Sequence, residues 1–131
     1  MGDVKELRLA LTVDDFDAAL AFYRDALGLE ELAMWVAEGA RGVLLGAGRA
    51  TLELFDEGQA AMVDKIEVGR RVAGPVRIAL EVGDSAAAAE RLVKAGAEQL
   101  ADPVETSWGD RNVRLRAPGG MQLTLFTPHG S

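Results

Sequence analysis

Cysteine is absent from this 131-residue sequence, and histidine occurs only once, as His129 near the C-terminal end. Without cysteine the chain has no disulfide framework, no thiol nucleophile and no zinc site built from thiolates. A lone histidine at this position also disfavours a Ser-His-Asp triad or a metal site made of several histidines. The chemistry of this protein must therefore rest on other residue types.

Long apolar runs and excess positive charge are also missing. No apolar stretch approaches the roughly 18 residues of a membrane span, and residues 1–6 lack the apolar core of a secretory signal. We therefore expect a cytoplasmic protein with no membrane partner. With 21 acidic and 14 basic residues, the net charge is −7 and the pI is about 4.7, which disfavours nucleic acid as a partner.

The sequence contains an internal repeat. Residues 8–13 read RLALTV and residues 77–82 read RIALEV; later in each half, residues 52–55 read LELF and residues 123–126 read LTLF. Two copies with so long a period do not make a solenoid. The repeat instead indicates a duplicated module.

Each half follows the same pattern of elements. Apolar residues alternate first, as in a half-buried strand, then recur at helical spacing, and short strand candidates follow. This predicts an α+β fold: one domain, 1–131, made of two βαβββ modules at about 5–57 and 75–127, which form a curled mixed sheet around a cleft. The linker 58–74 is polar, with a helical turn expected at Ala60–Lys65.

The two faces of the predicted sheet differ in composition. Helices must cover one face, and alternation places on it Leu7, Leu9, Leu11, Leu52, Leu54, Leu123 and Leu125. The opposite face receives Arg8, Ala10, Thr12, Thr51, Glu53, Phe55, Arg77, Ala79, Glu81, Gln122, Thr124 and Phe126. This mixture of charged, small and aromatic residues is typical of a ligand-lined concave surface.

Two motifs resemble a known superfamily. Residues 14–29 read DDFDAALAFYRDALGL; WGDR at residues 108–111 is followed by APGGMQLTLF at 117–126. Together with the repeat, they resemble the vicinal oxygen chelate proteins, which include glyoxalase, extradiol dioxygenases and bleomycin-resistance proteins. The resemblance covers nearly the whole chain and implies the glyoxalase/bleomycin-resistance fold and a homodimer.

The resemblance also locates the superfamily's four metal-ligand positions. In this sequence they fall on Arg8, Glu53, Arg77 and Thr124. A guanidinium has no free lone pair and stays protonated, so only Glu53 is a plausible ligand. We therefore expect no metal and no other cofactor.

The altered positions favour a metal-independent protein that sequesters a planar or anionic compound, as antibiotic-resistance members of the superfamily do. Arginine suits bidentate recognition of carboxylate or phosphate, and tryptophan stacks on flat ligands. The expected ligand-binding residues are Arg8, Trp35, Glu53, Phe55, Arg77, Trp108, Arg111, Thr124 and Phe126.

Several alternatives stay open at this point. Arg8 could pair with Glu53, and Arg77 with Glu81 or Glu53, simply to neutralise the charges on the concave face. The two phenylalanines could pack together, and the two tryptophans could cover the ends of the sheet. The protein could be a lyase or isomerase with Glu53 as general base, or a scaffold whose cleft is filled by its own side chains.

Overall fold

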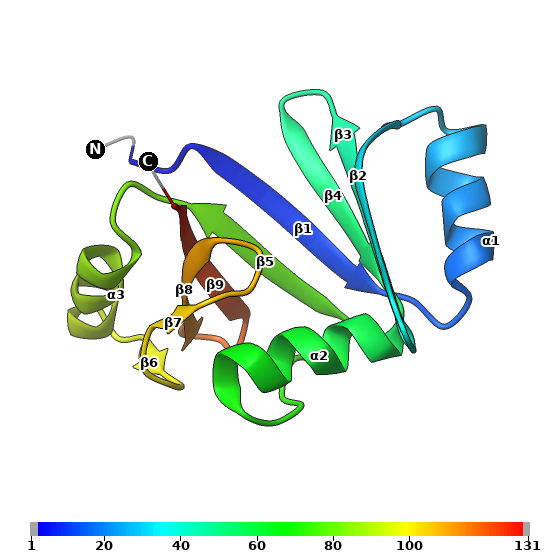
Figure 1. Ribbon diagram of the computed structural model, residues 1–131. Helices are drawn as coiled ribbons and strands as arrows, with labels where there is room; N and C mark the ends of the chain where they lie inside the picture. The colour runs from blue at the N-terminus through cyan, green and yellow to red at the C-terminus, as the bar shows by residue number, and fades with distance from the viewer. Residues whose placement is uncertain (1–2, 130–131) are drawn as a thin grey trace.

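Residues 3–129 are described by the computed structural model, and their strands join into one curled sheet (Figure 1). The strands are β1 (Glu6–Thr12), β2 (Glu30–Ala37), β3 (Ala40–Ala47), β4 (Ala50–Phe55), β5 (Val76–Glu81), β6 (Glu98–Gln99), β7 (Val104–Glu105), β8 (Asp110–Arg116) and β9 (Gln122–Pro128). Their order across the sheet is β2-β3-β4-β1-β5-β9-β8-β6, with β7 paired to β8.

The strand order confirms the predicted α+β fold. In the first half, β1 pairs in parallel with β4, and in the second half β5 pairs in parallel with β9. The two halves meet where β1 and β5 pair antiparallel, with Leu9 opposite Ile78. The second half adds only the two-residue strand β7 to the element order of the first.

One helix packs on the outer, convex face of each half. Helix α1 (Phe16–Leu20) continues into a π-helical segment, η1 (Ala21–Ala26), and the second half has α3 (Ser85–Lys94). The Asp15 and Asp84 carboxylates cap the starts of α1 and α3 by accepting backbone N–H bonds. Figure 1 shows α1 and α3 near opposite ends of the sheet.

The centre of the convex face is not covered. The exposed fractions of Leu7, Leu9 and Val76 are 44%, 36% and 37%. The prediction that Leu7 and Leu9 pack beneath helices is therefore wrong. The reason is that α1 contacts β4, whereas α3 contacts β8 and β9, so each helix covers its own half and leaves these three residues of the central strands β1 and β5 exposed.

The linker forms a full helix rather than a single turn. Helix α2 (Glu57–Val68) begins after Asp56, whose carboxylate caps it, and ends at Gly69, which has a left-handed φ of 88°. Between the halves of the sheet, α2 crosses the concave face (Figure 1), where its Ala60 and Val63 pack with Ala10 and Phe55.

Close approach to the β2–β3 turn fixes the start of α2. A Cβ at Gly58 would lie 1.6 Å from the carbonyl oxygen of Gly39, so only glycine fits there.

Within the described residues, no helix is long and apolar enough to cross a membrane.

Candidate functional site

A cavity of about 100 Å³ opens on the concave face. Every ligand-binding residue predicted from the sequence, except Arg111, lines it. Helix α2 adds Gln59, Val63 and Glu67 to the wall. The cavity lies beside Trp35, Glu53 and Trp108, so the cleft is not wholly filled by the protein's own side chains.

Arg111 lies elsewhere. Its guanidinium donates to the Glu105 carboxylate at 2.9 Å. It lines a separate polar depression with Glu105 and His129. Neighbours on a strand point to opposite faces, and Asn112, the next residue on β8, is the one that lines the cavity. The structure therefore does not bring Arg111 to the candidate site.

Glu53 is the unpaired carboxyl of the cavity. It lies on β4 and is 8% exposed. No side-chain hydrogen bond to it occurs within residues 3–129, and its oxygens are not among the side-chain atoms that are buried without a partner. Burial raises its pKa to about 7, although the positive charges of Arg8 and Arg77 oppose the shift. A fraction of this group is therefore protonated near neutral pH.

Arg8 pairs with a neighbour on its own strand rather than with Glu53. Its Nε and Nη2 donate to the two oxygens of Glu6 at 2.9 and 3.3 Å. Its guanidinium carbon lies 4.8 Å from the centre of the Phe126 ring, a cation–π distance. An arginine of the first half thus covers an aromatic ring of the second.

Arg77 shows the reciprocal arrangement. Its guanidinium carbon lies 5.4 Å from the centre of the Phe55 ring, and its Nη1 donates to Asp64 Oδ1 at 2.7 Å. The proposed pairing of Arg77 with Glu81 or Glu53 is therefore wrong. The reason is α2, which carries Asp64 to this side chain. Each of Phe55 and Phe126 faces a guanidinium from the other half.

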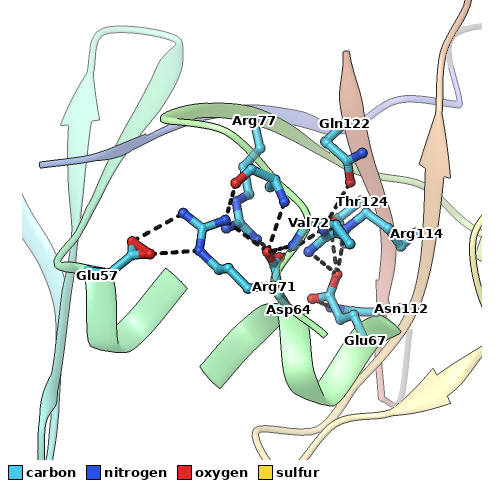
Figure 2. A network of polar contacts seen from close by, with 11 residues as sticks. Glu57, Asp64, Glu67, Arg71, Val72, Arg77, Asn112, Arg114, Gln122 and Thr124 are labelled. Atoms are coloured by element: carbon cyan, nitrogen blue, oxygen red, sulfur yellow. Dashed lines mark hydrogen bonds and ion pairs between the residues drawn. The ribbon is translucent and has the colours of Figure 1, made fainter. Parts of the chain in front are cut away.

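Asp64 is the centre of a buried polar network (Figure 2). Its side chain is 0% exposed and pairs with Arg71, Arg77 and Arg114. It also accepts the backbone N–H groups of Val72 and Ala73, each at 2.9 Å. Burial alone would raise the pKa of Asp64, but the two amides and the charges of Arg77 and Arg114 hold it well below its usual range.

Glu67, one turn further along α2, engages the second half of the sheet. Its Oε1 accepts from Arg114 Nη2 and from the Thr124 hydroxyl, each at 2.9 Å, and its Oε2 accepts from the Asn112 amide at 2.9 Å. Thr124 is thus tied to a helix, whereas Glu53, at the corresponding position of the first half, is not.

The residues at the four metal-ligand positions do not fit a metal ion. Arg8 and Arg77 offer only donors, and the Thr124 hydroxyl is engaged by Glu67. That leaves a single carboxyl, Glu53. Across residues 3–129, no group of three or more His, Cys, Asp or Glu side chains is placed to hold a metal.

Asp64 and Glu67 were not predicted from the sequence as residues of this site. A signal for them was present: Ala60, Val63, Asp64 and Glu67 follow the i, i+3, i+4, i+7 spacing of one helix face, and all four are buried. Two acids on that face interrupt the apolar pattern, which made the segment resemble a polar linker.

Replacing Glu53 with glutamine should change how stability depends on pH. The pKa of Glu53 is raised from 4.5 to about 7 in the folded protein. Between these two pH values the folded protein therefore keeps a proton on Glu53 that the unfolded chain has released. The contribution of Glu53 to the free energy of unfolding therefore falls as pH rises through this range and is constant above it. A shift of this size corresponds to about 3 kcal/mol.

Urea unfolding of wild type and Glu53→Gln at about pH 5 and about pH 8 measures this difference. The variant should gain stability relative to wild type at the higher pH. If the two proteins lose or gain stability in parallel, the raised pKa is wrong.

The fold is similar to those of several solved structures. A methylmalonyl-CoA epimerase in complex with methylmalonyl-CoA and NH4+ is 25% identical, with a TM-score of 0.69 over 97% of this chain and 96% of that one. The corresponding enzyme from Mycobacterium tuberculosis is 20% identical, with a TM-score of 0.64 over 96% and 87%. A hypothetical protein from Bacillus halodurans C-125 is 20% identical, with a TM-score of 0.70 over 95% and 94%.

No curated protein matches the sequence. The family model described as Glyoxalase/Bleomycin resistance protein/Dioxygenase superfamily matches residues 7–125. Because this match spans both halves of the sheet and the neighbours share the whole fold, the chain belongs to the glyoxalase/bleomycin resistance protein/dioxygenase superfamily.

Proposed function

We propose that this protein binds a small organic molecule in the concave cavity without a metal ion. The observation that carries the proposal is a buried carboxyl, Glu53, that has no hydrogen-bond partner among the described residues and lines an open cavity. The Glu53 oxygens are not among the side-chain atoms buried without a partner, so they are accessible from the cavity and free to bind a ligand.

The size of the cavity limits which ligands fit. Pockets for drug-sized compounds measure roughly 300–1,000 Å³, whereas this one measures about 100 Å³. It therefore suits a short molecule, or one end of a longer one, better than a whole bulky antibiotic. Trp108 lines the cavity and is 43% exposed, which suits it to stack on a planar part that projects outward.

Tryptophan fluorescence tests this proposal directly, because both tryptophans of the sequence line the cavity. We expect saturable quenching when chelator-treated protein is titrated with small anionic or planar compounds, and the same quenching after a divalent metal is added. Arg116→Met, which removes an exposed arginine paired with Glu98, should respond like wild type.

Two results would count against metal-free binding. One is the absence of a response to any compound. The other is a response to a divalent metal alone at micromolar concentration that disappears in Glu53→Gln.

A second candidate function is an isomerase that moves a proton next to a carbonyl group. The specific observation in its favour is the pKa of about 7 for Glu53, because a general base works best when its pKa lies near the working pH. The nearby cations Arg8 and Arg77 would stabilise the negative charge that develops. The likeness to methylmalonyl-CoA epimerase, at 25% identity, agrees with this candidate.

Proton exchange in heavy water distinguishes an enzyme from a binding protein. If the isomerase candidate holds, NMR should show the α-hydrogen of methylmalonyl-CoA being replaced by deuterium when wild-type protein is present. Glu53→Gln should slow this exchange by a factor of roughly a hundred or more. Exchange no faster than in buffer would exclude the activity on this substrate.

The bare centre of the convex face leads us to propose a homodimer. Leu9 lies opposite Ile78 and Leu11 opposite Val76 where β1 and β5 pair antiparallel. A two-fold interface sets the same surface patch of two chains against each other, and this apolar patch can pack against its own copy in that way. Exposed apolar patches of this kind mark sites of association.

Sedimentation measurements should show a dimer for wild type and a monomer for Leu9→Lys, because a charge at the centre of an apolar interface opposes association. Leu27→Lys changes an exposed leucine at the end of η1 and should remain dimeric. A monomeric wild-type protein, or a dimer that survives Leu9→Lys, would contradict this interface.

A further inference from the structure

Only one of the three guanidinium nitrogens of Arg77 makes a hydrogen bond within the described residues. Nη1 donates to Asp64, but Nε and Nη2 are buried and have no acceptor within residues 3–129. The side chain is 4% exposed, so bulk water does not replace the missing partners. Leaving buried donors of a charged group unpaired is costly.

The two unpaired nitrogens form one edge of the guanidinium. Their N–H bonds are parallel and spaced to meet the two oxygens of a carboxylate. The unpaired edge therefore has the donor geometry that a carboxylate requires. Arg77 lines the cavity, so this edge adjoins the proposed ligand site, and a ligand reaches its two buried nitrogens when the Arg77 side chain turns toward the cavity.

Other arginines of this protein show what that edge accepts. Arg8 uses Nε and Nη2 to hold both oxygens of Glu6, and Arg71 holds both oxygens of Glu57 in the same way, at 2.9 and 3.1 Å. In Arg114 the same two nitrogens converge on Glu67 Oε1 (Figure 2).

In each of these three cases a carboxylate of the protein fills the edge. Arg77 lacks one even though Glu53 lines the same cavity. Asp64 is already shared among three arginines and two amides.

We infer that the cavity receives a carboxylate and that Arg77 binds its two oxygens side-on through Nε and Nη2. This inference rests on the proposed function and names the chemical class of the ligand. Given the cavity of about 100 Å³, the ligand is a short carboxylic acid or the carboxylate end of a longer molecule.

The charges around the cavity couple this binding to a proton on Glu53. Among the groups that face Glu53, Arg8 and Arg77 are positive, and Glu6 and Glu67 are negative; Asp110 of β8 also lines the cavity. An ionised Glu53 and a bound carboxylate would be two like charges in one buried space. The ligand therefore binds to the form in which Glu53 is protonated, and its affinity falls as pH rises through the pKa of Glu53.

The inference can be tested by NMR on 15N-labelled protein with propionate and benzoate as probes, each compared with its neutral amide. We expect the carboxylates to shift the Arg77 Nε–H signal saturably and to bind roughly tenfold or more tightly than the amides. In wild type their affinity should fall roughly tenfold between about pH 6 and about pH 8. Glu53→Gln should abolish this pH dependence.

Arg77→Lys keeps a positive charge beside Asp64 but removes the paired donors. It should lose the preference for carboxylate over amide, whereas Arg116→Met should keep it. The wild-type comparison of acid with amide decides the question even if Arg77→Lys fails to fold.

The outcomes separate this inference from the proposed function. If acids and amides shift the tryptophan indole signals equally, or if the acids bind without moving Arg77 Nε–H, the side-on carboxylate is overturned while small-molecule binding stands. If neither acids nor amides move any signal of the cavity, and no compound quenches the tryptophans, both are overturned.

Discussion

The carboxylate of Asp64 is the contact on which the concave side of this protein depends. It is fully buried, pairs with Arg71, Arg77 and Arg114, and accepts two backbone N–H groups from the segment that follows α2. Its interactions hold α2 and the connection into β5 against the sheet. A buried carboxylate is tolerated only with this many partners, so helix, connection and arginines must come together as one unit.

The same helix makes two similar halves chemically different. Arg8 covers Phe126 and Arg77 covers Phe55, which preserves the symmetry of the repeat. Glu67 breaks it, because it engages Thr124 while leaving Glu53 free. The cavity thus has one side tied to α2 and one side that is not. On the second side lie the Glu53 carboxyl, whose pKa is raised, and Arg77, whose Nε and Nη2 are buried without a partner among the described residues.

The fold was predictable because its signals are local and repeated. Alternating apolar residues mark β1 and β5, helical spacing follows each, and the similarity of residues 8–13 to 77–82 indicates the duplication. Side-chain alternation along a strand also placed half of the cavity-lining residues on one face, since neighbours on a strand point to opposite sides. Arg111 follows the same alternation: its neighbour Asn112 on β8 faces the cavity, so Arg111 faces away from it.

What the sequence determined by itself is the α+β architecture, the two modules and the unsuitability of Arg8 and Arg77 as metal ligands, because each follows from local pattern or from the chemistry of one side chain. The tertiary structure alone decided which charges meet. Asp64 and Arg114 are far apart along the chain, and their ion pair depends on where α2 crosses the sheet. The exposure of Leu7 and Leu9 was decided in the same way, because it depends on which strands α1 and α3 cover. Such contacts are set by the packing of whole elements, which no local spacing encodes.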